Sequence, residues 1–499
     1  MKRIFFILAV TMVFTGYFSR SQEIIPMNQD ALFFFEKNIV KDSLCSHPSI
    51  KPFIVSNDSL FSNDSNYVRF GKEKSRLAIN PVINFSADFD KTSGIPFHFS
   101  YGLSLYGRLN QKLFVQGFLV DCMQRYENYM ANSTVVPHFG EYYRKKSFDD
   151  VYHYLIPAGV ISFAPSQHFN FMIGRQKNFL GEGYRSLFLS DNSNYSNALR
   201  GTLDIWHFKY MILYSWFRDI FTTTGTNQLH NKFTTTHYLS WNVTKWMNLN
   251  FFEAIIWPGE DSLGNRGFDV NYANPIIFFR PVEFSLGSPD NAMMGIGGTI
   301  KIKKKIHFYG QFLIDEFKIG EVRANTGWWG NKYGLQTGAK YVSEKFFARV
   351  EHNQVRPYTY SHQSSYSNYG SYCQPFAHPM GANFKEWVLQ SQYNVDRWLF
   401  SAKVFLIKYG LDTSSLSYGQ DIYRSYNDKV SEYGNFTTQG LLTTKNFTEI
   451  KVAYFLNKRA LIGVETGLRI RNIINALNES KQVFVFFGLR TYLFNNESE

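Results

Sequence analysis

The feature that most constrains this chain is a two-residue alternation of apolar and polar side chains, repeated in long segments. In the clearest one, Phe97, Phe99, Tyr101, Leu103 and Leu105 alternate with mostly small or polar residues. A β-strand points successive side chains to opposite faces, so such a segment has one apolar and one mostly polar face. Comparable segments recur from about residue 75 to the C-terminus. The chain is therefore predicted to be all-β.

The connections between these segments are of two kinds. Two-residue turns at Ser343-Glu344 and Asp396-Arg397 join neighbouring segments, whereas Gln124 to Val151 and Tyr358 to Lys385 are long and polar. Tight turns at one rim and long extracellular loops at the other are typical of outer-membrane barrels. Counting the segments predicts a transmembrane antiparallel β-barrel of about 16–18 strands. A barrel of that size has a wide lumen, which we expect the long loops to enter.

The last segment, Gln482 to Phe494, is predicted to close the barrel. Val483, Val485 and Phe487 share one face of it, and Phe484 and other residues share the opposite face. Its terminal aromatic residue is typical of the closing strand of an outer-membrane barrel. The alternative, an edge strand in a secreted sandwich, does not explain so many aromatic residues.

Composition agrees with a barrel that has one face in lipid. Aromatic and charged residues each make up 18% of the chain, and the mean hydropathy is −0.26. A helical membrane protein with many spans would be more apolar, and a disordered chain would lack the aromatic residues. The net charge of +12 forms no long basic stripe, which argues against a nucleic-acid partner. The expected surroundings of this chain are outer-membrane lipids.

The N-terminus carries the pattern of a secretory signal peptide. Lys2 and Arg3 precede an apolar run from Ile4 to Phe14, and small and polar residues continue to Gln22. The run is shorter than the ~20 residues of a membrane-spanning helix, so a helical anchor is the weaker alternative. We predict a signal peptide over residues 1–22, a short periplasmic segment over 23–76 and the barrel over 77–499. The mature protein is expected in a Gram-negative outer membrane.

The sequence contains no complete motif for catalysis or cofactor binding. The stretch Gly295-Ile296-Gly297-Gly298 lacks the third glycine of a dinucleotide loop, and no phosphate-binding loop or HExxH motif is present. Cys45, Cys122 and Cys373 are too widely spaced for a metal motif; one disulfide is possible, but the sequence does not choose the pair. We therefore predict no enzymatic activity, no cofactor and no metal site.

Two charge-rich segments, residues 174–192 and 266–284, are expected to lie in the barrel interior. An Arg at mid-depth on the lipid face costs ~2–4 kcal/mol, so we expect paired charges that tie inward loops to the wall and plug the lumen. Charges in a lumen can also bind an anionic or hydroxyl-rich ligand. We expect Arg280 to pair with Glu283 or Asp315. The predicted network consists of Arg175, Glu182, Arg185, Asp191, Arg280, Glu283, Asp315, Glu316 and Arg356.

These segments also carry a resemblance. Together with Trp328-Trp329-Gly330-Asn331-Lys332 and residues 353–362 and 374–383, they resemble the Wzi-type capsule-assembly barrel family. The similarity runs from about residue 75 to the C-terminus and is closest to the Bacteroidota branch, which includes the gliding-motility protein RemB. The resemblance implies an outer-membrane barrel of about 18 strands with no enzymatic activity and lectin-like affinity for surface polysaccharide.

The resemblance leads to a functional expectation with two alternatives. The chain is expected to help attach or assemble surface polysaccharide (capsule), or to act in gliding motility and surface adhesion. Tyrosine-rich loops suit sugar stacking, because a flat ring offers an apolar face beside a hydroxyl group. These tyrosines are Tyr358, Tyr360, Tyr366, Tyr369 and Tyr372. The alternatives are a solute channel (porin) and a structural subunit that binds other outer-membrane proteins.

Overall fold

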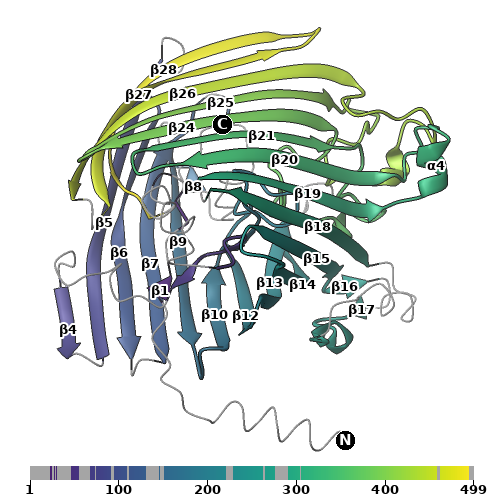
Figure 1. Ribbon diagram of the computed structural model, residues 1–499. Helices are drawn as coiled ribbons and strands as arrows, with labels where there is room; N and C mark the ends of the chain where they lie inside the picture. Colours follow the sequence, from purple (N-terminus) through teal and green to yellow (C-terminus); the bar gives the residue numbers. More distant parts are fainter. Residues whose placement is uncertain are drawn as a thin grey trace, which may run out of the picture.

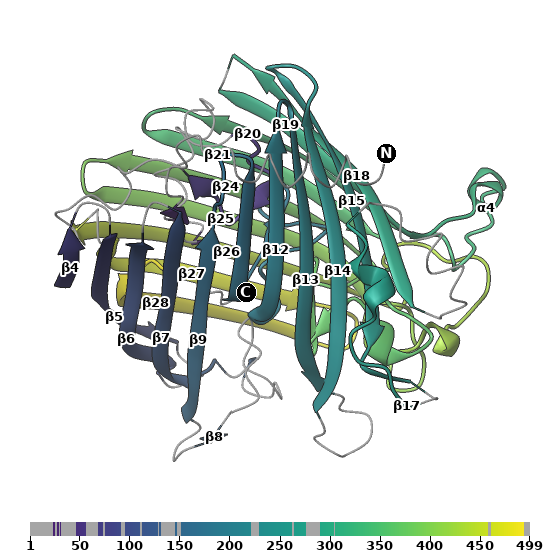
Figure 2. The ribbon, with the colours of Figure 1, turned by 90° about the horizontal axis from the view of Figure 1, so that it is seen from below.

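The chain folds into a closed antiparallel β-barrel, seen in a computed structural model (Figures 1 and 2). The structure describes residues 23–24, 27–28, 30, 46–55, 68–72, 75–90, 95–109, 112–127, 129–130, 145–146, 151–220, 229–261, 264–275, 290–303, 305–457 and 461–493. Within these ranges, 18 long strands form the barrel wall. This confirms the predicted all-β barrel and its strand number. The predicted signal peptide, residues 1–22, lies outside the described residues.

Each wall strand pairs with its sequence neighbours among the long strands. The wall strands are β5 (Ser75–Phe89), β6 (Phe97–Leu109), β7 (Leu113–Arg125), β9 (Val151–Phe163), β10 (Phe169–Gln176), β12 (Ser196–Ile205), β13 (Phe208–Ile220), β14 (Leu229–Asn242), β15 (Met247–Pro258), β18 (Asn291–Ile302), β19 (Ile306–Glu316), β20 (Lys332–Val342), β21 (Phe346–Val355), β24 (Phe384–Val395), β25 (Trp398–Leu411), β26 (Leu441–Asn457), β27 (Ile462–Ile474) and β28 (Glu479–Thr491).

The remaining described elements are short. They are β1 (Glu23–Ile24), β2 (Ile50–Lys51), β3 (Ile54–Val55), β4 (Val68–Lys72), β8 (Lys145–Lys146), β11 (Phe179–Leu180), β16 (Glu260–Asp261), β17 (Gly264–Asn265), η3 (Val270–Ala273), α4 (Ile319–Arg323), η4 (Ser365–Ser367), β22 (Gly370–Ser371), β23 (Gln374–Pro375) and η5 (Tyr426–Asp428). In the described part of the chain, no helix is long and apolar enough to cross a membrane.

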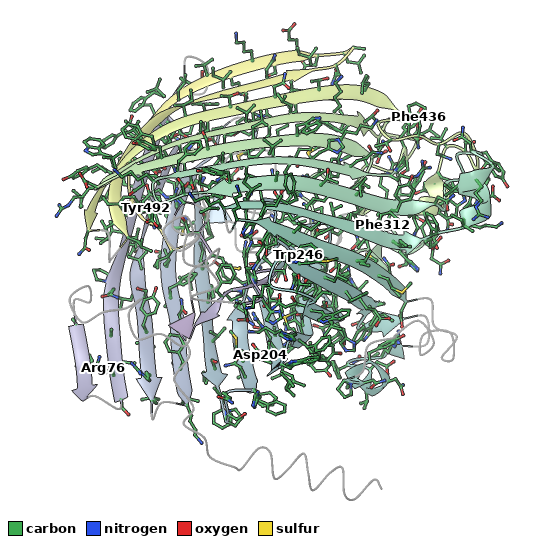
Figure 3. All side chains as sticks on the ribbon, in the orientation of Figure 1. Arg76, Asp204, Trp246, Phe312, Phe436 and Tyr492 are labelled. Carbon is green, nitrogen blue, oxygen red and sulfur yellow. The ribbon has the colours of Figure 1, made fainter. Side chains whose placement is uncertain are left out.

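The alternation seen in the sequence separates an outer from an inner face of the wall (Figure 3). On β28, Val485 and Phe487 are 52% and 50% exposed, whereas Phe484 and Phe486 are 2% and 1% exposed. Leu103 and Leu119 on β6 and β7 are also exposed. Apolar side chains on the outside of a barrel are stable only against lipid. The predicted faces of the closing strand are thus confirmed, and Phe494 lies outside the described residues.

The two rims differ as predicted. At the short-turn rim, Val395 pairs with Trp398 across a two-residue turn. Asp396 in this turn has a φ of 48°, a left-handed conformation that Asp tolerates better than most residues. At the other, long-loop rim, the connection 356–383 carries η4 and the β22–β23 hairpin, and the connection 412–440 carries η5. In Figure 1, the label α4 marks this rim.

The barrel closes between β5 and β28, and this seam is short. Its backbone pairing covers only residues 85–89 and 485–489. Beyond that stretch, the Thr491 N–H donates to Asn84 Oδ1 at 2.7 Å, and β4 pairs with the start of β5. Inside the wall, Arg469 on β27 donates to Asp88 on β5 at 2.8 Å. Side chains therefore complete a closure that the backbone ladder makes only in part.

Candidate functional site

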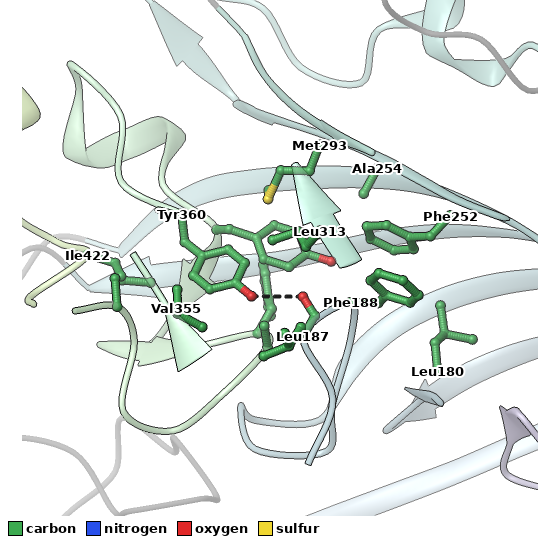
Figure 4. Close-up of a cluster of buried hydrophobic side chains, with 14 of the residues drawn as sticks. Leu180, Leu187, Phe188, Phe252, Ala254, Met293, Leu313, Val355, Tyr360 and Ile422 are labelled. Atoms are coloured by element: carbon green, nitrogen blue, oxygen red, sulfur yellow. Dashed lines mark hydrogen bonds between the residues drawn. The ribbon is translucent and has the colours of Figure 1, made fainter. Parts of the chain in front are cut away.

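A loop between β10 and β12 folds into the lumen. We call residues 177–195 the plug loop. Leu187 and Phe188 at its tip are fully buried among inward-facing residues of the wall. The Phe188 ring stacks on Phe252 of β15, with centroids 4.7 Å apart and planes at 4°. Tyr360 from a long-loop connection donates its hydroxyl to the Leu187 carbonyl at 2.8 Å (Figure 4).

The glycine stretch of β18 has a packing role. A Cβ on Gly295 would lie 2.3 Å from the Phe188 ring, so only glycine leaves room for this ring against the wall. A strand glycine often marks such a close approach. This explains a motif that the sequence associates weakly with dinucleotide binding.

Wall side chains satisfy the main chain of the plug loop. The Glu351 carboxylate accepts the N–H groups of Tyr184 and Arg185 at 2.8 and 3.1 Å. Gln311 Oε1 accepts the Leu187 N–H at 2.8 Å. A buried loop needs such partners because unpaired backbone groups are costly away from water. These bonds fix the plug loop to β19 and β21.

Two ion pairs add to these bonds. Lys340 Nζ on β20 lies 2.9 Å from Glu182 Oε2, and Arg185 Nη2 lies 3.5 Å from Glu386 Oε1 on β24. Burial by itself would raise the pKa of Glu182, but the charge of Lys340 lowers it to about 2. His378 Nε2 lies 2.6 Å from the other Glu386 oxygen. All of these groups are buried, so the plug loop is held by charges in a region of low dielectric.

Described residues of the N-terminal segment also lie against the inner face of the wall. β2 pairs with β11 of the plug loop. His47 Nδ1 lies 2.9 Å from Ser240 Oγ, and Ser49 Oγ donates to Asn250 Oδ1 at 3.1 Å. Asp30 accepts a bond from Gln392 at 3.1 Å and pairs with Lys451. These described residues thus lie inside the barrel beside the plug loop, and the periplasmic location of residues 23–76 as a whole stays a prediction.

The space beside the plug loop is small. A cavity of about 30 Å³ remains there, lined among others by Lys177, Asn178, Ser190, Thr234 and Tyr369. A cavity of this size holds about one or two water molecules.

Three predicted charges join the loops of the long-loop rim. Lys332 Nζ lies 3.2 Å from Asp315 and 3.3 Å from Glu316. The second Asp315 oxygen accepts the Tyr360 N–H at 2.9 Å. Arg356 Nε donates to the Asn331 carbonyl at 2.8 Å. Its Nη2 donates to the carbonyl of Asn435, in the β25–β26 connection, at 3.2 Å. These side chains anchor loops rather than face an open lumen.

The other predicted network residues have different positions. Arg175 lies half-buried on β10, and Asp191 accepts Lys177 Nζ through its main-chain carbonyl at 2.6 Å. Arg280 and Glu283 lie outside the described residues, so the pair we expected first stays a prediction. Ion pairs and hydrogen bonds join Glu182, Arg185 and Asp315 to wall residues outside the predicted set. These wall residues are Lys332, Lys340, Glu351 and Glu386.

The wall residues carry a signal in the sequence. Lys332, Gln336 and Lys340 occupy every second inward position of β20, with glycine at the inward positions between them. Listing the charged and polar residues at the inward positions of each strand would have identified them. The predicted network is drawn from charge-rich segments, so it does not include these residues of the wall.

The described part of the second charge-rich segment lies outside the barrel, which corrects our expectation. Met211 and Leu213 of β13 belong to the inner core, so Tyr210 and Tyr214 point outward. Their hydroxyls donate to the carbonyls of residues 275 and 273 at 2.9 and 2.8 Å. Outward tyrosines thus hold residues 264–275 against the lipid-facing side of the wall.

The charge in this outer segment is neutralised locally. Arg266 lies 2.8 Å from Asp269 and 2.6 Å from Asp290, and Tyr272 donates to Asp290 at 2.6 Å. These contacts raise the pKa of Arg266 above its usual value despite partial burial, which by itself lowers it. The charge of the Arg266 guanidinium is balanced by two carboxylates, so it needs no counter-charge from the lumen. This is the physical reason why the segment lies outside the barrel and not inside it as predicted.

The described residues provide no chemistry for catalysis by a metal. No group of three or more His, Cys, Asp or Glu residues among them could hold a metal ion. Cys122 and Cys373 form no disulfide with one another, and Cys45 lies outside the described ranges. What the arrangement does is occupy part of the lumen with the plug loop and bond the loops at one rim to one another.

Comparison with known proteins gives a relationship in fold. No protein-family model and no curated protein sequence matches the chain. The structure is similar to Wzi of Escherichia coli, described as an outer-membrane protein involved in group 1 capsule assembly and a carbohydrate-binding β-barrel. The TM-score is 0.56 at 12% sequence identity, covering 95% of this chain and 100% of Wzi.

Two porin structures also match. They are OprD of Pseudomonas aeruginosa (TM-score 0.44, 9% identity, covering 83% of this chain and 94% of OprD) and a BenF-like porin of Pseudomonas fluorescens (TM-score 0.45, 9% identity, covering 83% and 98%). At 12% identity, the likeness to Wzi shows a shared fold. The chain has the fold of an outer-membrane β-barrel, the same fold as Wzi.

Proposed function

We propose that this protein is a non-enzymatic outer-membrane barrel that attaches or helps assemble surface polysaccharide at the cell exterior. The observation that carries the proposal is the combination of a lumen occupied by the plug loop with rigidly bonded loops at the long-loop rim. A barrel so filled is suited to present a surface rather than to conduct solutes. Wzi, which has the same fold, is a carbohydrate-binding barrel involved in capsule assembly, and this supports the proposal.

The proposal includes a location and an orientation. The signal-peptide pattern and the lipid-facing outer wall support export and insertion into the outer membrane. The long-loop rim would then face the exterior and the short-turn rim the periplasm. Membership of the RemB branch and a role in gliding stay predictions.

The test is a deletion strain compared with a strain complemented on a plasmid. Cell-bound and released surface polysaccharide are measured separately by uronic-acid or hexose assay. We expect cell-bound polysaccharide to fall and released polysaccharide to rise on deletion, with recovery on complementation. Unchanged retention would overturn the proposal, and a stable open conductance of the purified wild type in planar bilayers would favour the porin alternative.

A specific observation favours a second candidate, an accessory subunit of a larger outer-membrane assembly. The outer segment exposes Phe268 and Val270, which are 44% and 77% accessible, beside the wall. An apolar surface there suits contact with lipid or with another membrane protein. Stoichiometric co-purification of a partner that is lost on Val270→Asp would support this candidate.

A further inference from the structure

Two long-loop connections form one bonded surface at the long-loop rim. The Trp329 N–H donates to the Glu432 carbonyl at 3.0 Å, and the Gly434 N–H donates to Thr326 at 2.9 Å. The Asn435 N–H donates to Gly327 at 2.8 Å. Residues 324–331 and 430–437 are thus held side by side by backbone bonds; we call this surface the aromatic platform. In Figures 1 and 3 it lies at the end of the barrel that carries α4 and Phe436.

The aromatic platform displays large rings to solvent. Tyr433 and Phe436 are 55% and 62% exposed, and Trp328 is half-buried. Apolar rings are unfavourable in water, so exposed rings on two loops that are bonded to each other indicate a binding surface. Rigid backbone matters because binding then costs little ordering entropy.

Trp329 packs against residues that adjoin the aromatic platform. Its ring lies 4.8 Å from the Tyr426 ring, and Lys429 Nζ lies 4.6 Å from the Trp329 centroid. These contacts cover part of its ring, as Lys318 Nζ at 5.5 Å covers part of the Trp328 ring. Trp329 also bonds the two loops through its own main chain, so we assign it a positioning role. Arg356, one of the charges predicted from sequence, ties the same two loops through the carbonyls of Asn331 and Asn435.

The charges around the aromatic platform offset one another. Lys318 lies 3.3 Å from Glu321, and Lys429 lies 2.9 Å from Glu432. Such exposed pairs contribute little energy and leave no strong field of one sign. A ligand recognised by charge, such as an anionic lipid headgroup or an acidic peptide, is therefore not favoured here.

Resting on the proposed function, we infer that the aromatic platform is the polysaccharide-contacting site, with Trp328, Tyr433 and Phe436 as contact rings. The C–H faces of a pyranose ring stack on flat aromatic rings, while its hydroxyls need nearby donors and acceptors. Asn325, Ser431 and Glu432 are exposed on the same two loops and offer such groups. The ligand class is a hydroxyl-rich pyranose polymer, bound through ring stacking and not through its charge.

The experiment uses the full-length protein in detergent and, as probe, surface polysaccharide extracted from the producing strain. Binding is followed by tryptophan fluorescence and isothermal calorimetry. We expect the double variant Tyr433→Ala/Phe436→Ala and the variant Trp328→Ala each to weaken binding about tenfold or more, and Trp328→Phe to retain it. Wild-type affinity should change less than about threefold between 50 and 500 mM NaCl, because screening acts on charges and not on stacking.

Matched controls are Phe268→Ala and Trp206→Ala, which remove exposed aromatic rings away from the aromatic platform. Heat-modifiability on gels confirms that each variant is a folded barrel. If the wild type binds the polysaccharide and the aromatic-platform variants bind equally well, the site assignment is overturned and the proposed function stands. If the wild type binds none of the polysaccharide, the proposed function fails together with the inference.

Discussion

The buried pair Glu182–Lys340 offers a direct test of the plug loop. A carboxyl pKa lowered from 4.5 to about 2 corresponds to a preference of roughly 3 kcal/mol for the charged form. Removing one partner of a buried pair costs about 3–5 kcal/mol, because the other charge is left uncompensated. Lys340→Met should therefore destabilise the seated plug loop by about 3 kcal/mol. That change raises the population of the displaced loop about 100-fold.

The double variant Lys340→Met/Glu182→Gln removes both charges and is expected to behave much like the wild type. The assay is single-channel recording in planar bilayers at neutral pH, where a displaced plug loop gives openings. Lys318→Met is the matched control, since its pair with Glu321 is exposed at the rim. Equal leak in the wild type, the single variant and the double variant would refute the reasoning, as would a double variant that leaks more than the single one.

The pH dependence has a defined sign. The pKa of Glu182 is below its ordinary value of 4.5, so its stabilising contribution is complete above about pH 4.5 and is lost as the pH falls towards 2. The wild-type plug loop should thus stay seated at pH 5. In Lys340→Met, burial without the counter-charge raises the pKa of Glu182, so acidification should reduce the leak.

Three further predictions concern the core, the seam and the outer segment. Phe188→Ala removes the ring stacked on Phe252 and should cost about 3–5 kcal/mol of unfolding free energy in urea, whereas Phe487→Ala on the exposed outer face should cost far less. Arg469→Ala breaks the seam contact to Asp88 and a second contact to Glu449 on the neighbouring strand β26, so the barrel should unfold on gels at a lower temperature; an unchanged transition would show that the backbone ladder suffices. Tyr210→Phe/Tyr214→Phe removes two hydrogen bonds of about 1 kcal/mol each and should expose residues 264–275 to protease on intact cells, with the barrel itself still folded.

The sequence predicts that a loop enters the lumen, but it does not predict which wall residues that loop contacts. The charge-rich run after β10 predicts an inward loop, and Glu182 and Arg185 do lie in the plug loop. Their partners Lys340 and Glu386 are more than 150 residues away in the chain, and nothing local in the sequence specifies which inward position meets which loop residue. The position of residues 266–275 could not be predicted either, because their charges fit an interior or an outer position equally well. Only the contacts with Asp290 and with the outward tyrosines decide between the two.

The sequence by itself determined the wall of this protein. Strand direction, face and rim follow from a two-residue period and from turn length, because a strand fixes the direction of each side chain from its own backbone. The tertiary structure alone decided how the lumen is filled, which strands share the short seam, and which loops meet to form the aromatic platform. Those features depend on contacts between distant segments, and their energies come from burial and charge pairing that exist only once the barrel has closed.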